Sequence, residues 1–148
     1  MGTTYKVILY GKEIQTSQKE INNIFESVNQ EMSTYLADSS ISQINKNDLL
    51  EWSKVSKGFI RVLNFAIDLC NDTDGVYDVS LGRLVNTWGF GPTQATDLTQ
   101  DEEKTIVEEI GCDSVQVDQE SVRRLKDVYL DFSSIAKGHA IDLVHLEL

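Results

Sequence analysis

The apolar residues of the chain first follow a helical pattern. Ser17 and Glu20 form a capping box, and apolar side chains then recur at helical spacing, so residues 18–31 are predicted to form an amphipathic helix. The same spacing predicts a second helix over about 57–70, with an apolar face made of Phe59, Val62, Leu63, Ala66 and Cys70. The loop between them, 32–47, is polar and has room for one helical turn.

Two further helices are expected nearer the C-terminus. Thr99 and Glu102 form a second capping box in front of residues 100–110, and Gly111 is placed to end that helix. A last helix is predicted to begin near Ile135 and to continue to the end of the chain.

Four short runs predict β-strands. A run rich in β-branched and aromatic residues covers 3–10, and shorter runs cover 114–118, 121–125 and 128–132. Strands that follow one another, with helices grouped apart from them, favour an α+β fold over a repeated βαβ unit. No repeat or linker divides the 148 residues, so they form one domain or part of one.

Composition and charge exclude several classes of protein. The net charge of −11 would repel a nucleic-acid backbone, and no apolar run reaches the ~20 residues that span a bilayer. Cys70 and Cys112 fit no metal-binding motif, and we expect them to be buried thiols rather than a disulfide. His139 and His145 are poorly spaced for two ligands on one helix face, so we read both as non-metal residues.

The segment 76–92 fits neither the helical nor the strand period. It contains three glycines and the only proline of the chain, and segments of this kind often line a site. Tyr77, Trp88 and Phe90 could stack on a flat ring, although packing in the core is the commoner role of such side chains.

The stretch 131–140, DFSSIAKGHA, joins a predicted strand to the last predicted helix. The first amides of a helix suit a phosphate group, and Lys137 would add a positive charge there. The alternative is that Ser133 or Ser134 only caps the helix and that Lys137 is a solvated surface residue.

Two aspartates are further candidates for a binding site. Asp78 and Asp131 are flanked by apolar residues, where a carboxylate needs either hydrogen-bond partners or a ligand. A capping or edge position explains each of them equally well.

Four blocks of the sequence, taken together, resemble the ApbE family of flavin transferases, once called thiamine biosynthesis lipoproteins. They follow one another in the family's order and spacing, and the resemblance covers essentially the whole chain. The blocks are MGTTYKV at 1–7, MSTYLADSSISQIN at 32–45, GVYDVSLGRLVNTWGFGP at 75–92 and LDFSSIAKGHAID at 130–142.

This resemblance implies an α+β fold related to the T-fold and a specific transferase activity. Members of the family bind FAD and, with Mg2+, transfer its FMN moiety to a threonine of a partner flavoprotein, releasing AMP. The acceptor threonine ends a short motif that begins with aspartate. The resemblance also implies a periplasmic location or the outer face of the bacterial inner membrane, although the chain carries no signal peptide and a cytoplasmic location stays open.

The resemblance assigns roles to particular residues. Ser134 corresponds to a metal ligand, through its backbone carbonyl. The residues that correspond to FAD-contacting positions are Met1, Tyr35, Val76, Tyr77, Asp78, Asp131 and Lys137.

The chain resembles only the N-terminal half of a family member. The later family segments that complete the Mg2+ site have no counterpart, so we expect a truncated piece that transfers FMN poorly or not at all. Two alternatives are an FAD-binding module without transfer and a split protein that needs a complementary chain. The last helix is expected to expose Ala140, Leu143, Val144 and Leu146, which would favour self-association.

Overall fold

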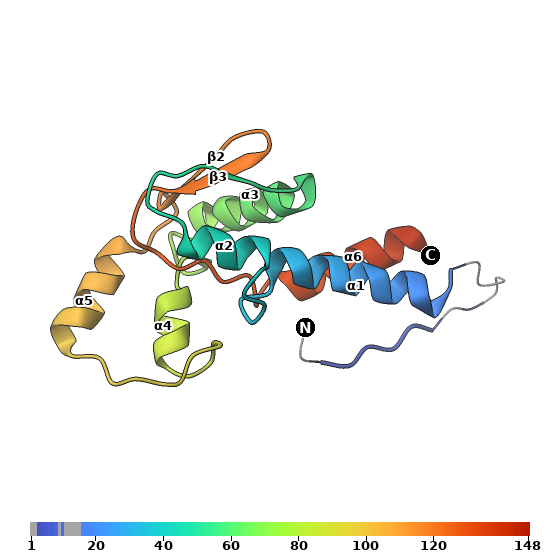
Figure 1. The fold of residues 1–148 in the computed structure, drawn as a ribbon, viewed down its shortest axis with the longest axis horizontal. Coiled ribbons are helices and arrows are strands. Elements are labelled where there is room, and N and C mark those ends of the chain that lie inside the picture. The colour runs from blue at the N-terminus through green and yellow to red at the C-terminus, as the bar shows by residue number, and fades with distance from the viewer. Residues whose placement is uncertain (1–2, 9, 11–15) are drawn as a thin grey trace.

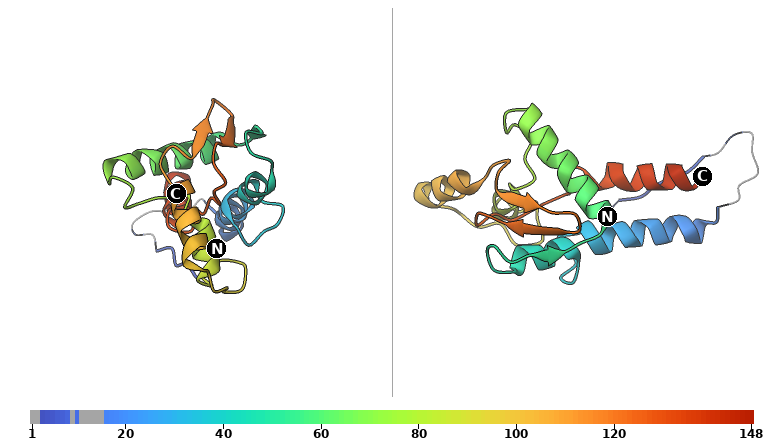
Figure 2. Two further views of the ribbon diagram at one scale, coloured as in Figure 1. Left: turned by 90° about the vertical axis from the view of Figure 1, so that its left-hand side faces the viewer. Right: turned by 90° about the horizontal axis from the view of Figure 1, so that it is seen from above.

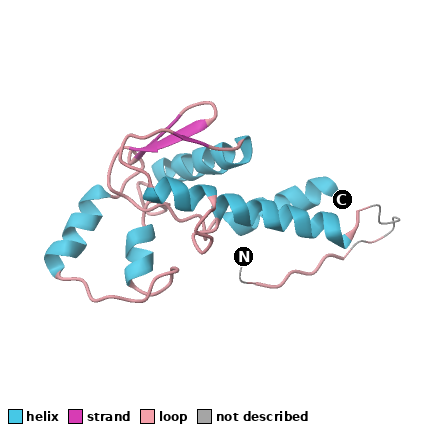
Figure 3. Ribbon diagram, in the orientation of Figure 1, coloured by secondary structure: helices cyan, strands magenta, loops and turns pink. Residues whose placement is uncertain are grey.

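The computed structural model describes residues 3–8, 10 and 16–148, and it contains helices and a small sheet. Figure 1 shows their arrangement and Figure 3 the distribution of helices and strands. The helices are α1 (Gln18–Met32), α2 (Ser40–Lys46), α3 (Lys57–Asp72), α4 (Gly82–Thr87), α5 (Gln100–Glu109) and α6 (Ala136–Glu147). The strands are β1 (Ser53–Lys54), β2 (Val115–Val117) and β3 (Ser121–Arg124).

The helices predicted from periodicity and capping are confirmed. Both capping boxes form, at Ser17 with Glu20 and at Thr99 with Glu102. No helix in the described part of the chain is both long enough and apolar enough to cross a membrane.

The sheet is antiparallel, with strand order β1-β3-β2, which confirms the α+β class. Val115 and Val122 from the sheet and Phe59 and Leu63 from α3 belong to one hydrophobic core. Helix α3 therefore packs on the sheet, and α4 and α5 lie together on the other side of the molecule (Figure 2).

Helices α1 and α6 lie side by side and run in opposite directions (Figures 1 and 2). Ala140 and Val144 of α6 are buried, and Leu143 is partly buried against the core. The expectation that these residues would be exposed is therefore wrong for all three, because α1 covers this face of α6. Leu146 is exposed, as expected.

Two of the predicted strands are absent. Residues 128–132 bury Val128, Leu130 and Phe132 in the core, but they make only one isolated parallel bridge, between Tyr129 and Leu81. The described residues of 3–10 form no strand either; Tyr5 instead packs on Phe25 of α1. A strand needs a hydrogen-bonded neighbour as well as suitable side chains, and neither segment has a ladder of such bonds in the described part.

The two cysteines form a disulfide, which corrects the expectation of free thiols. The Sγ atoms of Cys70 and Cys112 are 1.99 Å apart and the Cα atoms 5.7 Å apart. Cys70 lies in the last turn of α3 and Cys112 just after α5, so the bridge closes the loop that contains segment 76–92. Forty-two positions separate the two residues, which is why no local spacing motif revealed the pair.

Candidate functional site

Two segments that carry candidate site residues, and that are far apart in the sequence, lie side by side. The Asp131 amide donates a hydrogen bond to the Val79 carbonyl at 2.8 Å, and the Gly82 amide donates one to the Tyr129 carbonyl at 2.9 Å. The third and fourth family-like blocks are thereby joined through their backbones.

Gly82 permits this close approach. A Cβ atom added at residue 82 would lie 2.5 Å from the Tyr129 carbonyl oxygen, a backbone atom that cannot move away easily. Any side chain at this position would therefore push the two segments apart.

Each of the two candidate aspartates accepts a hydrogen bond from the backbone amide two residues after it. Oδ1 of Asp78 accepts a hydrogen bond from the Ser80 amide at 2.7 Å, and Oδ1 of Asp131 accepts one from the Ser133 amide at 2.7 Å. Both aspartates are half-buried, and within the described residues neither forms an ion pair. The turn-capping role is therefore present, and it occupies one carboxylate oxygen of each residue with a local amide.

A side-chain contact also joins the two segments. The hydroxyl groups of Tyr77 and Ser134 lie 3.0 Å apart and share a hydrogen bond. Val76, the neighbour of Tyr77, is 87% exposed.

The start of α6 differs from the predicted phosphate cradle. Ile135 is the N-cap residue and no side chain caps the helix, so neither Ser133 nor Ser134 has the expected capping role. The amides of Ile135 and Ala136 both donate to the Phe132 carbonyl. These two amides are satisfied internally, and any anion must be held by other groups.

Lys137 is neither buried nor freely solvated. Its Nζ donates a hydrogen bond to the Ser133 carbonyl at 2.6 Å, which folds the side chain back over the turn that precedes α6. The ammonium group is thereby held at the rim of a cavity.

That cavity has a volume of about 620 Å³ and lies between the end of α1, the following loop and the start of α6. Its apolar residues are Val28, Met32, Leu36 and Ala136, and its other lining residues are Thr3, Asn29, Ser33, Thr34, Tyr35, Ser133 and Lys137. Ligand sites commonly combine an apolar wall with a few polar groups in this size range.

The cavity wall connects to the aromatic segment after α4. Tyr35 donates a hydrogen bond from its hydroxyl group to the Phe90 carbonyl at 3.1 Å. Trp88 and Phe90 are 59% and 76% exposed, so core packing, the commoner role expected for them, is wrong for both. Tyr77 does pack partly against the core.

The structure therefore brings most of the sequence-predicted site residues into one region. Tyr35 and Lys137 line the cavity. Tyr77 contacts Ser134, which directly follows the lining residue Ser133 in the chain. Met1 lies outside the described residues, and Val76 faces solvent.

The described residues offer no complete set of the side chains that usually bind metals. Within them no three His, Cys, Asp or Glu side chains cluster as metal ligands. Mg2+ requires about six oxygen ligands in octahedral geometry, and Ser134 alone offers a hydroxyl and a carbonyl. The residues present therefore do not fit a complete Mg2+ site.

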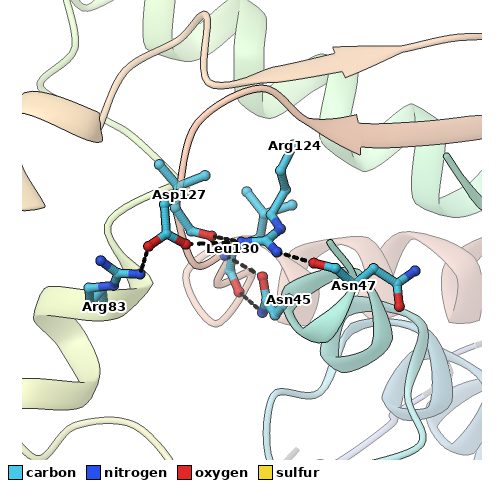
Figure 4. Close-up of polar contacts among 7 residues, drawn as sticks. Asn45, Asn47, Arg83, Arg124, Asp127 and Leu130 are labelled. Carbon is cyan, nitrogen blue, oxygen red and sulfur yellow. Dashed lines mark hydrogen bonds and ion pairs between the residues drawn. The ribbon is translucent and has the colours of Figure 1, made fainter. Parts of the chain in front are cut away.

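Sequence reasoning missed the apolar wall of the cavity and a polar network behind the site. Val28 and Met32 belong to the apolar stripe of α1, which gave no sign that part of it borders a cavity. In the network, Asp127 contacts Arg83 and Arg124 (Figure 4). The hydrogen bond from Arg83 lowers the pKa of Asp127, and burial lowers the pKa of Arg124.

Comparison with known proteins agrees with this geometry. A family model described as the ApbE family matches residues 1–148. An FAD:protein FMN transferase of Haemophilus influenzae is 38% identical over 157 residues, which cover 97% of this chain and 45% of the relative. The corresponding protein of Vibrio cholerae is 36% identical, with 97% of this chain and 45% of the relative covered.

Solved structures of ApbE proteins also resemble this chain in fold. A flavin transferase ApbE from Vibrio cholerae matches with a TM-score of 0.83 at 36% identity, covering 88% of this chain and 43% of that one. The apo form of a Pseudomonas stutzeri flavinyl transferase ApbE matches with a TM-score of 0.81 at 26% identity, covering 87% and 44%. The chain spans less than half the length of these relatives. It belongs to the ApbE family.

Proposed function

We propose that this chain supplies one side of the flavin-nucleotide site of an FAD:protein FMN transferase. The observation that carries the proposal is the meeting of three family-like blocks at one cavity, with Tyr35 and Lys137 on its wall and Asp131 bonded to the lining residue Ser133. The names of the relatives support the reaction, and the apolar wall suits a flavin or adenine ring.

The proposed reaction is a phosphoryl transfer. A threonine oxygen of the acceptor protein attacks the phosphorus on the FMN side of the FAD pyrophosphate, the bond to the AMP oxygen breaks, and AMP leaves while the threonine proton is lost. Lys137 lies at the cavity rim, where its charge would attract the phosphate groups. Holding the two reactants in line supplies much of the acceleration in such reactions.

We carry the Mg2+ requirement over from the family resemblance alone. Ser134 is the proposed ligand in this chain, through its carbonyl, and the further oxygen ligands would have to come from residues outside those described. No step of the reaction is assigned to the metal.

The proposed partners are FAD and an acceptor flavoprotein with a threonine in its motif.

The disulfide supports the periplasm, or the outer face of the inner membrane, as the location, because such bonds persist in oxidising compartments. Self-association remains a proposal, supported by exposed Ile141 and Leu146 on α6.

A chimera tests the proposed function. This chain would replace the matching part of the Haemophilus influenzae relative, and the chimera would be incubated with FAD, Mg2+ and an acceptor peptide containing the threonine motif. Mass spectrometry is expected to find FMN on the threonine, with AMP released. FAD binding without transfer would favour the alternative of a binding module, and a folded chimera that binds no FAD would contradict the site.

Asp78→Ala is expected to weaken FAD binding by the chimera about tenfold. The Asp78 carboxylate holds the Ser80 amide, and a hydrogen bond to a charged group is worth about 1.5–3 kcal/mol. Its loss would release the turn next to Tyr77. A flavin fluorescence titration measures the change in affinity.

Asp72→Ala is the matched control for this prediction. Asp72 is an exposed aspartate in the last turn of α3, close to Asp78 in sequence and equal to it in charge. We expect its replacement to change the affinity less than about twofold, since an exposed surface substitution has little effect. Equal losses for the two variants would contradict the role of Asp78.

A further inference from the structure

Leu130, the buried residue just before Asp131, has both of its backbone groups bonded to one side chain. Asn45 of α2 donates a hydrogen bond from Nδ2 to the Leu130 carbonyl at 2.9 Å, and its Oδ1 accepts one from the Leu130 amide at 2.8 Å (Figure 4). The two residues are 85 positions apart. One side-chain amide thus satisfies both backbone groups of a fully buried residue.

The other edge of the segment around Leu130 pairs with the loop that contains Asp78. The residues on either side of Leu130 make the backbone bonds: Tyr129 accepts from Gly82, and Asp131 donates to Val79. Asn45 therefore takes the place of a neighbouring strand on one edge, while the loop that contains Asp78 pairs with the other. Leu130 is therefore linked to Asp131 as its neighbour in the chain, and to the loop that contains Asp78 through the Asp131–Val79 bond.

A buried arginine strengthens the same attachment to α2. Arg124 donates hydrogen bonds to the Val128 carbonyl at 2.9 Å and to the Asn47 carbonyl, at the C-cap of α2. Asp127 in turn pairs with Arg83 of α4 at 2.6 Å. These contacts tie the start of the segment to α2 and α4, and Asn45 is the contact nearest to Asp131.

We propose that Asn45 is a positioning residue, whose amide fixes Leu130 and thereby sets the placement of Asp131 and Asp78 for flavin binding. This inference rests on the proposed function for its link to FAD. Asn45 is not one of the cavity-lining residues, and its side-chain amide bonds to the Leu130 backbone.

Asn45→Asp separates positioning from a general loss of stability. Above its pKa the introduced carboxylate still accepts from the Leu130 amide but places an acceptor against the Leu130 carbonyl. When protonated, it can donate to that carbonyl and restore both bonds. Burial and the facing carbonyl dipole raise the pKa of the introduced group above the usual value of about 3.9, so restoration is expected near pH 5.5.

Other charged groups near this segment are Arg124, Asp127, Arg83 and Asp48. The wild-type chain carries the same groups, so its own pH dependence measures any effect of their titration on the segment without the introduced carboxylate. Asn45→Ala removes both hydrogen bonds at every pH and should show no restoration. Asn64→Asp, at an exposed position of α3, adds the same charge without touching the segment.

The first readout is amide hydrogen exchange of the folded chain by NMR. At pH 8, Asn45→Asp is expected to raise the exchange of the Leu130, Asp131 and Gly82 amides at least about tenfold relative to the β2–β3 amides. At pH 5.5, after correction for intrinsic rates, most of that protection should return. Wild-type protection at Asp131 and Gly82 in the variant at pH 8 would overturn the inference.

The second readout is FAD affinity, measured by NMR titration on chains that are fully folded. Asn45→Asp is expected to weaken binding about tenfold at pH 8 and to recover to within about threefold of wild type at pH 5.5. An unchanged affinity at pH 8, or equal losses in Asn64→Asp, would overturn the link to flavin binding. If the wild-type chain itself binds no FAD, the proposed function fails, and the exchange data still decide whether Asn45 places Asp131.

Discussion

Replacing both Cys70 and Cys112 by alanine is expected to lower the free energy of unfolding by about 4 kcal/mol. A cross-link restricts the unfolded chain, and for a loop of 42 residues the chain-entropy estimate gives about that value. The corresponding fall in Tm is about 10 °C for a domain of this size. Urea or thermal unfolding followed by circular dichroism measures both quantities.

Reduction of the wild-type chain is the control for this prediction. Cys70 is buried, so the alanine variant also loses packing around its sulfur, whereas reduction keeps both sulfurs in place. The reduced wild type should therefore lose most, but not all, of the same stability. A variant that unfolds within about 1 kcal/mol of the oxidised wild type would mean that the bridge contributes little.

Phe59→Ala is expected to destabilise the chain by about 3–5 kcal/mol, because it leaves a cavity in the core. Phe59 is fully buried, and its ring centroid lies 5.0 Å from that of Phe132, which directly follows Asp131. Phe132→Ala should have a similar effect. The double variant should lose less than the sum, with a coupling of about 0.5–1.5 kcal/mol for the ring pair.

Phe65→Ala is the matched control, since Phe65 lies on the same helix and is 58% exposed. Its replacement should change the unfolding free energy by less than about 1 kcal/mol. Chemical denaturation of the variants gives the comparison. Similar losses at Phe59 and Phe65 would contradict the assignment of the core to the buried face of α3.

Helices α1, α3, α5 and α6 were predictable because their signals are local, whereas α4 (Gly82–Thr87) was missed, because segment 76–92 fits no helical period. A capping box lies within one turn, and the apolar stripe of α1 or α3 repeats within a single element. The fold class followed from the grouping of the predicted strands apart from the predicted helices. The short strand β1 (Ser53–Lys54) was missed because two residues carry no periodicity.

The failures involve partners that are distant in sequence. The run 128–132 has strand-like side chains, yet an amide side chain, Asn45, occupies one edge where a strand was expected. The disulfide was missed for a similar reason, because only the packing of α3 against the turn after α5 brings its cysteines together. No local pattern encodes either contact.

The candidate site was partly predictable, through the family-like blocks rather than through any single residue. The residues predicted from these blocks include Tyr35, Tyr77, Asp131 and Lys137, and the fold brings them close to the start of α6. The apolar wall of the cavity could not be read from them, because α1 and α6 form it only after they pack together.

The most direct test of the central claim is an NMR titration of the chain with FAD, which reports weak binding residue by residue. We expect the largest amide shifts at Tyr35, Tyr77 and Asp78 and over 131–137, with little change in the β2–β3 hairpin. We expect the affinity to be weak, because the chain spans less than half of its relatives. Shifts confined to other surfaces, or none at saturating FAD, would contradict the proposed flavin site.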